Sequence, residues 1–432
     1  MKKIASYALG CKVNQYESEA IAELFAEKGY EVVSVDDEAD VYIINTCTVT
    51  NFGDKKSRQL IRKVKRQNEN AIVAVVGCYA QTAPEELAAV HGVNLVIGTK
   101  DKSKIVELVE DYQAEQGVQN YVTDIMHERV FEPLEIKKLA NRTRAYLKIQ
   151  DGCSQFCSYC IIPYARGPIR SRQPEDVIAE VKRLAENGFK EVVLTGIHVA
   201  SYGKDLKTIT LTDIIRQVHE VEGIERIRFS SIEPNVVTEE FAAAMAELPK
   251  VCDHFHLSLQ SGCDKTLKEM NRKYDTEKYR QAAALLRKYL PDVAITTDII
   301  VGFPGETEED YQASRAFAEE IGFSKIHVFP YSPKKGTPAA ARKDQLQNVV
   351  KQERSHDLIT VSDRMTDAFL QKHVGKVMPV LFERCIGDDV YEGHTTNYMK
   401  VHARSTKDLS NVIADTKIIS VAEEMAFGEV EA

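Results

Sequence analysis

Three cysteines stand close together near the middle of this 432-residue chain, at Cys153, Cys157 and Cys160. They follow an apolar run that we expect to be a strand, so the three thiols share one short loop. Three thiolates on such a loop can hold three irons of a cubane iron–sulfur cluster, which leaves the fourth iron open to a small molecule. A structural zinc site, the alternative, normally closes with a fourth Cys or His, and the nearest histidines are His127 and His198.

Three further cysteines, Cys11, Cys47 and Cys78, each follow a short apolar run near the N-terminus. If these runs are neighbouring parallel strands, their carboxyl ends meet at one sheet edge, where ligands bind. The three thiols can then surround a second cubane cluster. Taken singly, each of these residues is more simply interpreted as a buried, unreactive cysteine. Taken together with the cluster motif of the central loop, they favour a second cluster.

Residues 1–112 alternate apolar runs with amphipathic segments, which predicts an open parallel sheet covered by helices. We expect strands at 4–9, 41–45, 72–76 and 95–97, and helices at 15–29, 54–68 and 101–112. Residues 113–141 are mixed and polar, and we interpret them as a linker.

The alternation resumes in residues 142–371, and the predicted fold class is therefore α/β. We expect strands at 145–149, 192–195, 226–230, 255–259, 295–301 and 326–329, and helices at 175–187, 277–289, 307–320 and 344–370. Six strand–helix units fall short of the eight in a complete barrel, so we predict a partial (β/α)6 barrel. Residues 372–432 instead predict a small all-β barrel of the OB type.

The sequence gives no sign of export or membrane insertion. The apolar stretch at 4–9 is too short for a secretory signal, and no window approaches the roughly 18 apolar residues of a membrane span. We therefore expect a cytoplasmic protein with no membrane partner. Thiols stay reduced there, so patterned cysteines serve as metal ligands or catalysts rather than disulfides.

The spacing Cys-x3-Cys-x2-Cys after the first strand of a partial barrel resembles the radical S-adenosylmethionine superfamily. The resemblance implies that Cys153, Cys157 and Cys160 hold a catalytic cluster whose open iron binds S-adenosylmethionine and cleaves it to a 5′-deoxyadenosyl radical. It also implies contacts to that cofactor from residues at the ends of the barrel strands. These residues are Tyr159, Gly196, Ser258, Gln260, Asp298, Gly302 and Pro304.

Across nearly its whole length the chain resembles the methylthiotransferase family, which combines such a core with an N-terminal three-cysteine domain and a C-terminal RNA-binding TRAM barrel. The resemblance implies an enzyme that inserts sulfur into a C–H bond and methylates it. It implies two [4Fe-4S] clusters, S-adenosylmethionine, a sulfur source and an external electron donor. The other cysteines and three histidines match no ligand position and read as structural: Cys252, Cys263, Cys385, His198, His254 and His256.

The net charge of −9 does not indicate a nucleic-acid partner, but the distribution of charged residues along the chain does. Residues 55–66 hold seven Lys/Arg and no acid, and residues 137–172 have a balance of +7, so the rest of the chain carries −23. These basic segments flank the cysteines and would attract RNA, although solvated faces are the simpler alternative. The C-terminal segment 372–432 has a balance of −3, so aromatic and backbone contacts would have to contribute to RNA binding there.

The family contains RNA and protein modifiers, and the motif Leu9-Gly10-Cys11-Lys12-Val13 separates them by resemblance. Its Lys-Val pair resembles the branch that acts on N6-threonylcarbamoyladenosine at position 37, beside the anticodon. The isopentenyladenosine branch tends to carry Gln-Met there, and the ribosomal-protein branch Pro-Lys. We therefore expect methylthiolation of C2 of that base in the tRNA anticodon stem-loop. The alternatives are isopentenyladenosine-37, a ribosomal protein side chain, or a non-catalytic iron–sulfur protein that binds RNA.

Overall fold

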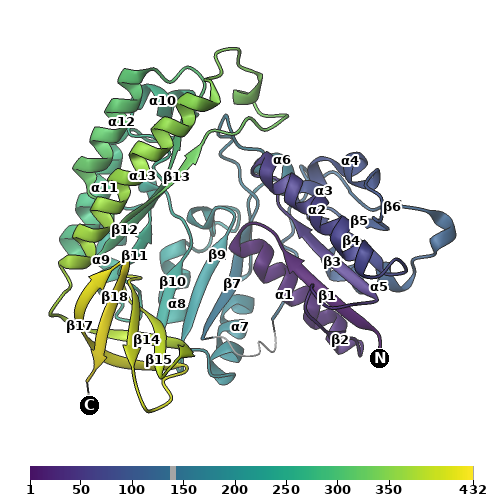
Figure 1. Ribbon diagram of the computed structural model, residues 1–432, viewed down its shortest axis with the longest axis horizontal. Helices are drawn as coiled ribbons and strands as arrows, with labels where there is room; N and C mark the ends of the chain where they lie inside the picture. The colour runs from purple at the N-terminus through teal and green to yellow at the C-terminus, as the bar shows by residue number, and fades with distance from the viewer. Residues whose placement is uncertain (137–142, 432) are drawn as a thin grey trace.

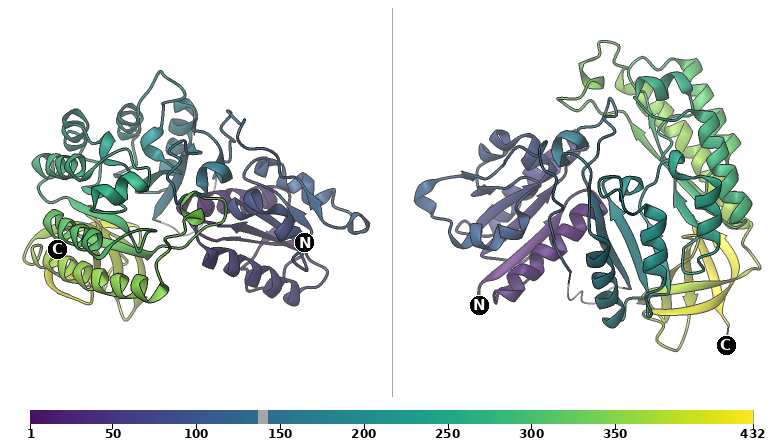
Figure 2. Two further views of the ribbon diagram at one scale, coloured as in Figure 1. Left: turned by 90° about the horizontal axis from the view of Figure 1, so that it is seen from above. Right: turned by 180° about the vertical axis from the view of Figure 1, so that it is seen from behind.

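The computed structural model describes residues 1–136 and 143–431, and it has the three expected parts. In Figure 1 the N-terminal α/β domain, in purple and blue, lies beside the teal and green core, and the yellow C-terminal barrel packs against the end of the core. The turned views in Figure 2 keep the N-terminal domain on the side of the core away from its outer helices. The predicted α/β class with a small closed β-barrel is confirmed.

The N-terminal domain is built on a parallel sheet with the strand order β2-β1-β3-β4-β5-β6. Its strands are β1 (Lys3–Ala8), β2 (Glu31–Val32), β3 (Val41–Thr46), β4 (Ile72–Gly77), β5 (Leu95–Val96) and β6 (Gln119–Asn120). After β1 the chain forms β2 at one edge of the sheet. It then crosses to the other side of β1 and adds β3 to β6 in order, so the topological switch point lies between β1 and β3. Strand β6 lies within the segment that we interpreted as a linker.

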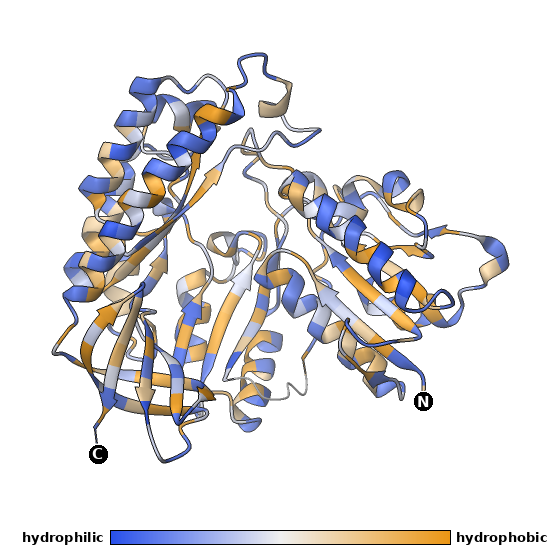
Figure 3. Ribbon diagram, in the orientation of Figure 1, coloured by the Kyte–Doolittle hydropathy of each residue, from blue (hydrophilic) through white to orange (hydrophobic). Residues whose placement is uncertain are grey.

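Helices cover both faces of this sheet, which explains why every residue of β3 is buried. Helix α2 (Asn51–Gln67) packs on one face through Ile61 and Val64, together with α3 (Cys78–Thr82) and α4 (Pro84–Ala88). Helix α1 (Lys12–Glu27) packs on the other through Ile21 and Phe25, beside α5 (Ile105–Glu110). In Figure 3 the apolar colour is concentrated in the strands and on the helix faces toward them.

The core is the predicted partial barrel of six parallel strands. They are β7 (Arg144–Asp151), β9 (Glu191–Gly196), β10 (Arg226–Phe229), β11 (His254–His256), β12 (Ala294–Val301) and β13 (Lys325–Pro330). Neighbours pair in parallel along the chain, and two isolated bridges connect β10 to the segments around β11. The short strand β8 (Arg170–Ser171) adds to β7 in the antiparallel sense.

Most core helices lie outside these strands, so the strand ends stay open toward the N-terminal domain (Figure 2). They are α7 (Pro174–Glu186), α8 (Leu211–His219), α9 (Glu239–Ala246), α10 (Asp264–Glu269), α11 (Thr276–Tyr289), α12 (Glu308–Ile321) and α13 (Asn348–Gln371). The short helix α6 (Ile162–Arg166) instead lies against α3 of the N-terminal domain. Capping boxes at Thr210 and Thr307 fix the first residues of α8 and α12.

The C-terminal barrel closes in the order β14-β15-β16-β18-β17. Its strands are β14 (Val377–Gly387), β15 (Val390–Thr395), β16 (Lys400–Arg404), β17 (Val412–Ala422) and β18 (Met425–Val430). Two arginines of β10 hold the barrel to the core: Arg226 donates to the carbonyls of His394 and Pro379 at 2.8 Å, and Arg228 donates to that of Thr396 at 3.0 Å.

A buried ionic network holds the N-terminal domain to the core. Glu17 of α1 is fully buried and pairs with Arg166 at 2.6 Å, Lys148 at 2.8 Å and Lys102 at 3.3 Å. Asp151 of β7 joins it through Lys148 at 2.7 Å. Burial alone would raise the pKa of Glu17, but the three cations outweigh it and hold the pKa well below its usual range.

This network corrects the expectation that residues 137–172 form a basic surface. Lys148, Arg166, Arg170 and Arg172 are 0–3% exposed, and they pair with Glu17, Asp151 and Glu180. Arg144 pairs with Glu383 of the barrel, and Lys137, Lys138 and Arg142 lie outside the described residues. The described cations therefore connect parts of the protein. Residues 55–66 differ, because Lys55, Lys56, Arg62, Lys63 and Arg66 are exposed on α2.

The network predicts a large cost for removing its central carboxylate. Glu17→Gln leaves buried cations with one partner fewer and should destabilise the chain by about 3 kcal/mol, measured as a lower urea midpoint of the transition that unfolds the N-terminal domain. Glu27→Gln, at the exposed end of the same helix, should change stability by less than about 0.5 kcal/mol. Equal effects of the two substitutions would contradict the network's role.

Candidate active site

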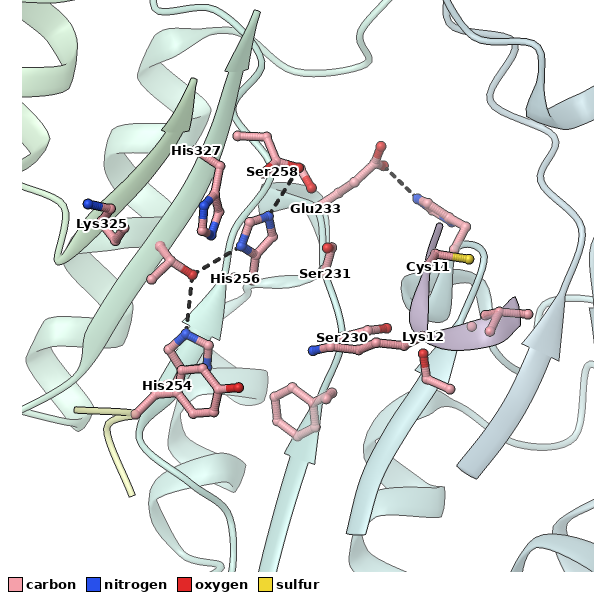
Figure 4. Close-up of a pocket in the computed structure, with 18 of the residues that line it drawn as sticks. Cys11, Lys12, Ser230, Ser231, Glu233, His254, His256, Ser258, Lys325 and His327 are labelled. Carbon is pink, nitrogen blue, oxygen red and sulfur yellow. Dashed lines mark hydrogen bonds and ion pairs between the residues drawn. The ribbon is translucent and has the colours of Figure 1, made fainter. Parts of the chain in front are cut away.

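A cavity of about 1010 Å³ opens where the N-terminal domain, the core and the barrel meet. Cys11 and Lys12 line it from the N-terminal domain, the central cysteine loop lines it from the core, and Tyr398 lines it from the barrel. In the close-up in Figure 4, Cys11 lies on the opposite side of this space from His254, His256 and His327 of the core. Both sheets present the carboxyl ends of their strands to the cavity, the position at which such folds place their sites.

The central cysteine loop is fixed at both ends by backbone contacts. Gly152, directly after β7, has φ +72°, and a Cβ there would lie 1.8 Å from the carbonyl oxygen of Pro168. The amide of Cys153 donates to Gly167 at 2.9 Å, and that of Ser158 donates to Met270 at 3.0 Å. The loop therefore holds its thiols toward the cavity without a fourth protein ligand nearby in the sequence.

The thiols of this loop are desolvated and lie close to one another. Burial raises the pKa of Cys153 to about 11, and burial with the neighbouring Cys157 raises that of Cys160 to about 12. Arg272 donates to the Cys157 sulfur at 3.3 Å and pairs with Glu233 at 3.0 Å. A metal must therefore displace protons from these thiols, as thiolate sites do. Three free thiols on one cavity wall fit three irons of a cubane cluster.

The structure also brings the three N-terminal cysteines together at the switch-point edge. Cys11 follows β1, Cys47 follows β3 and Cys78 begins α3 after β4. A Cβ on Gly10 would lie 2.6 Å from the Cys47 sulfur. Burial, followed by the nearby Cys78, raises the pKa of Cys47 to about 12, and burial also raises that of Cys11. These three free thiols offer the same donor set as the central loop.

Arg166 connects the core segment that follows the central cysteine loop to the N-terminal cysteine site. It stands six residues after Cys160, at the end of α6, and its Nε donates to the Cys78 sulfur at 3.2 Å. Its guanidinium also donates to Asn14 at 2.7 Å, and Asn14 donates to the carbonyls of Leu9 and Thr46. One side chain of the core thus touches the backbone scaffold of the N-terminal site, which fixes the two sets relative to each other.

The residues predicted to contact S-adenosylmethionine divide into two groups. Tyr159, Gly196, Ser258 and Asp298 line the cavity. Gln260, Gly302 and Pro304 are not among the described residues that line it. Gln260 adopts φ +72° and donates its amide to Asp298, and Gly302 donates its amide to Glu306 at 2.6 Å. These residues shape the strand-end turns, and Pro304 is buried in the second of them.

Sequence reasoning passed over several polar residues of the cavity. His198, His254 and His256, interpreted as core or surface residues, all line it, as do Glu233, Arg272 and His327. His256 contacts Thr296 at 3.0 Å and Asp298 at 3.3 Å (Figure 4). Burial lowers the pKa of His254 well below its usual value, so it is neutral. The spacing of His254 and His256 on β11 could have indicated that both side chains lie on the same side of the sheet, because residues two apart share one face of a strand.

Comparisons with known proteins agree with this geometry. Residues 147–318 match the Radical SAM superfamily, and residues 3–98 match Uncharacterized protein family UPF0004. The chain is 45% identical to the threonylcarbamoyladenosine tRNA methylthiotransferase MtaB of Bacillus subtilis, over 97% of this chain and 94% of that protein. The chain belongs to the radical S-adenosylmethionine methylthiotransferase family. Its core therefore uses S-adenosylmethionine and a [4Fe-4S] cluster.

Other members of this methylthiotransferase family differ in their named substrate. The Thermotoga maritima MtaB is 36% identical over the full length of both chains. The tRNA-2-methylthio-N(6)-dimethylallyladenosine synthase of Thermoanaerobacter sp. is 37% identical over 98% of this chain and 91% of that one. The radical methyltransferase TsrM of Kitasatospora setae shares the fold with a TM-score of 0.57, at 16% identity over 79% of this chain and 77% of that one.

Within the described ranges 1–136 and 143–431, the helices are too short or too polar to cross a membrane.

The tight backbone around Gly152 gives a direct test of the central loop. In Gly152→Ala the new methyl group collides with the Pro168 carbonyl, so the loop must shift, and the chain should lose most of the iron bound there. Gly188→Ala is a matched control, because Gly188 has φ +85° but open space around its Cβ position, and it should keep wild-type iron. Iron per chain after anaerobic reconstitution reports the result, and wild-type iron in Gly152→Ala would contradict the assigned geometry.

Proposed function

We propose that this enzyme methylthiolates C2 of N6-threonylcarbamoyladenosine-37 in tRNA. The observation that carries the proposal is that the central thiols Cys153, Cys157 and Cys160 line one cavity together with Cys11 of the second set of free thiols. Arg166, shortly after the central loop, contacts Cys78 of that second set. The relatives named MtaB over nearly the full length of the chain support the same substrate.

The two thiol sets divide the chemistry. Cys153, Cys157 and Cys160 would hold a cluster that supplies reductive cleavage of S-adenosylmethionine, and Cys11, Cys47 and Cys78 would hold a second that supplies the site for sulfur. The chain itself positions these groups by the buried contacts of Arg166 and Gly152. A separate electron donor and a sulfur source complete the proposed reaction.

Polar groups of the core wall would orient the cofactor. The Ser258 hydroxyl can donate or accept hydrogen bonds, the Asp298 carboxylate can accept them from hydroxyl and amino groups, and Tyr159 offers an aromatic face. Burial would raise the pKa of Glu233, but His198 and Arg272 outweigh burial and lower it, so a carboxylate remains available on the same wall. We propose these side chains as the binding set for S-adenosylmethionine.

The substrate base must leave its stack to reach a cavity of this depth, as in other enzymes that act on a base edge. The exposed cations of α2 would hold the phosphates of the anticodon stem-loop. The barrel has a balance of −3, so its exposed aromatic side chains, such as Tyr398 and Phe427, would stack rather than attract by charge.

Single cysteine substitutions separate the roles of the two thiol sets. In a complemented deletion strain, Cys157→Ala should abolish the methylthio nucleoside in tRNA, and the purified variant should release no 5′-deoxyadenosine. Cys78→Ala should also abolish the nucleoside but keep the release of 5′-deoxyadenosine, because the central loop is intact. Cys385→Ala, on the exposed barrel surface, should keep both. Nucleoside mass spectrometry and anaerobic assays with dithionite measure these outcomes.

The same strains decide between the alternatives. Undiminished methylthio-threonylcarbamoyladenosine in Cys157→Ala would overturn the proposal. Loss of the dimethylallyl nucleoside would indicate the other tRNA substrate, and an altered ribosomal-protein mass would indicate a protein substrate. A wild-type protein that releases no 5′-deoxyadenosine would indicate a non-catalytic iron–sulfur protein.

The basic face of α2 predicts a salt-dependent contact. Arg62 and Arg66 are exposed and border a shallow groove with His91. Replacing both with Gln should weaken tRNA binding several-fold and reduce the slope of log affinity against log salt by about 2. The double substitution Lys182→Gln and Lys288→Gln removes the same charge from exposed sites on α7 and α11. Equal losses in the two double variants would show that α2 has no special role.

A further inference from the structure

Four Lys and Arg side chains line the cavity: Lys12, Arg272, Lys325 and Lys400. Three of them are neutralised by carboxylates. Arg272 pairs with Glu233 at 3.0 Å, Lys400 pairs with Glu392 at 3.4 Å, and Lys325 pairs with Asp363 and Glu424. Lys12 differs from the other three, because no carboxylate of residues 1–136 or 143–431 forms an ion pair with it. Its ammonium lies 5.8 Å from the centre of the Tyr146 ring.

The position of Lys12 is as specific as its charge. It is the first residue of α1, next to Cys11, and Asn14 fixes this turn against the backbone of β1 and β3. Figure 4 shows its side chain reaching across the cavity beside Ser230, toward His254 of the core. A group held by Lys12 would therefore lie between the N-terminal cysteine site and the histidines of β11.

The surrounding charges do not supply the missing anion. Deeper in the same region, Arg144 pairs with Glu383 at 3.0 Å and Arg228 pairs with Glu191 at 2.9 Å, so each of these cations is already balanced. His254 is neutral. Within residues 1–136 and 143–431, Lys12 is thus a cation of the cavity wall without an ion-pair partner. A substrate that displaces solvent from it must bring an anionic group, or the desolvated ammonium opposes binding.

The proposed substrate carries one such group. Threonine joined through its nitrogen to the carbamoyl group of the base keeps its carboxylate, whereas an unmodified adenine or a dimethylallyl group has no charge. We propose that Lys12 binds the threonyl carboxylate and selects the threonylcarbamoyl base over uncharged bases. This inference rests on the proposed function and assigns the residue that reads the modification. An ammonium–carboxylate contact of this kind contributes roughly tenfold to hundredfold in affinity.

Binding experiments with a neutralised substrate isolate this contact. We would measure the affinity of the reconstituted protein for three anticodon stem-loops, carrying adenosine, threonylcarbamoyladenosine or its methyl ester at position 37. The wild type should bind the free acid at least tenfold more tightly than the ester. Lys12→Met should bind both equally, at the level at which the wild type binds the ester, and Lys12→Arg should restore most of the preference.

A matched control and a kinetic readout exclude a merely structural effect. Lys400→Met removes a paired cation of the same cavity and should keep the preference for the acid. Lys12→Met should keep the iron content and substrate-free 5′-deoxyadenosine release of the wild type, and it should raise KM for the threonylcarbamoyl stem-loop far more than it lowers kcat.

The two levels of the proposal fail separately. If the wild type does not convert the threonylcarbamoyl stem-loop, the proposed function is wrong, and the assignment of Lys12 fails with it. If the wild type converts it and Lys12→Met still prefers the acid over the ester as strongly as the wild type does, only the assignment of Lys12 is overturned.

Discussion

The contacts of one buried guanidinium, that of Arg166, are the constraint on which the rest of the site depends. Arg166 is fully buried, it pairs with Glu17 and Asp151, and it donates to the sulfur of Cys78. A charge in that position is tolerated only when it is fully paired, so the N-terminal domain has essentially one way to dock on the core. This docking places the central cysteines and Cys11 along one cavity, with Cys78 held against Arg166.

Charge is used in two different ways in this molecule. Inside the domain interface, cations and carboxylates balance and carry structure, as in the pairs of Lys148 with Glu17 and of Arg228 with Glu191. At the cavity and on α2, positive charge remains without equal compensation and is available to RNA and to the modified base. The acidic net charge therefore conceals a division between structural and binding cations, which only the folded arrangement separates.

The sequence predicted the parts of the fold that follow from local pattern. The strands that end near Cys11, Cys47, Cys78 and Cys153 were found because each is a short apolar run, and parallel pairing then brings their ends together. Strands β2 and β6 were missed because each has only two residues, which is too short to give a periodic signal. The central cysteines were found through their spacing, and Cys11, Cys47 and Cys78 were found through their positions after apolar runs. Arg272 and Glu233, in contrast, meet only in three dimensions, through a pairing between distant segments. For the same reason, no local pattern separated the buried arginines at 166–172 from the exposed cations of α2.

We expect both cysteine sets to hold clusters, in the relation that Arg166 imposes. Iron analysis and electron paramagnetic resonance of the anaerobically reconstituted, dithionite-reduced protein measure this relation. The protein should contain about eight irons per chain, as two four-iron clusters, and give a spectrum in which the two reduced clusters interact magnetically. Four irons per chain, or two clusters with independent spectra, would contradict this expectation.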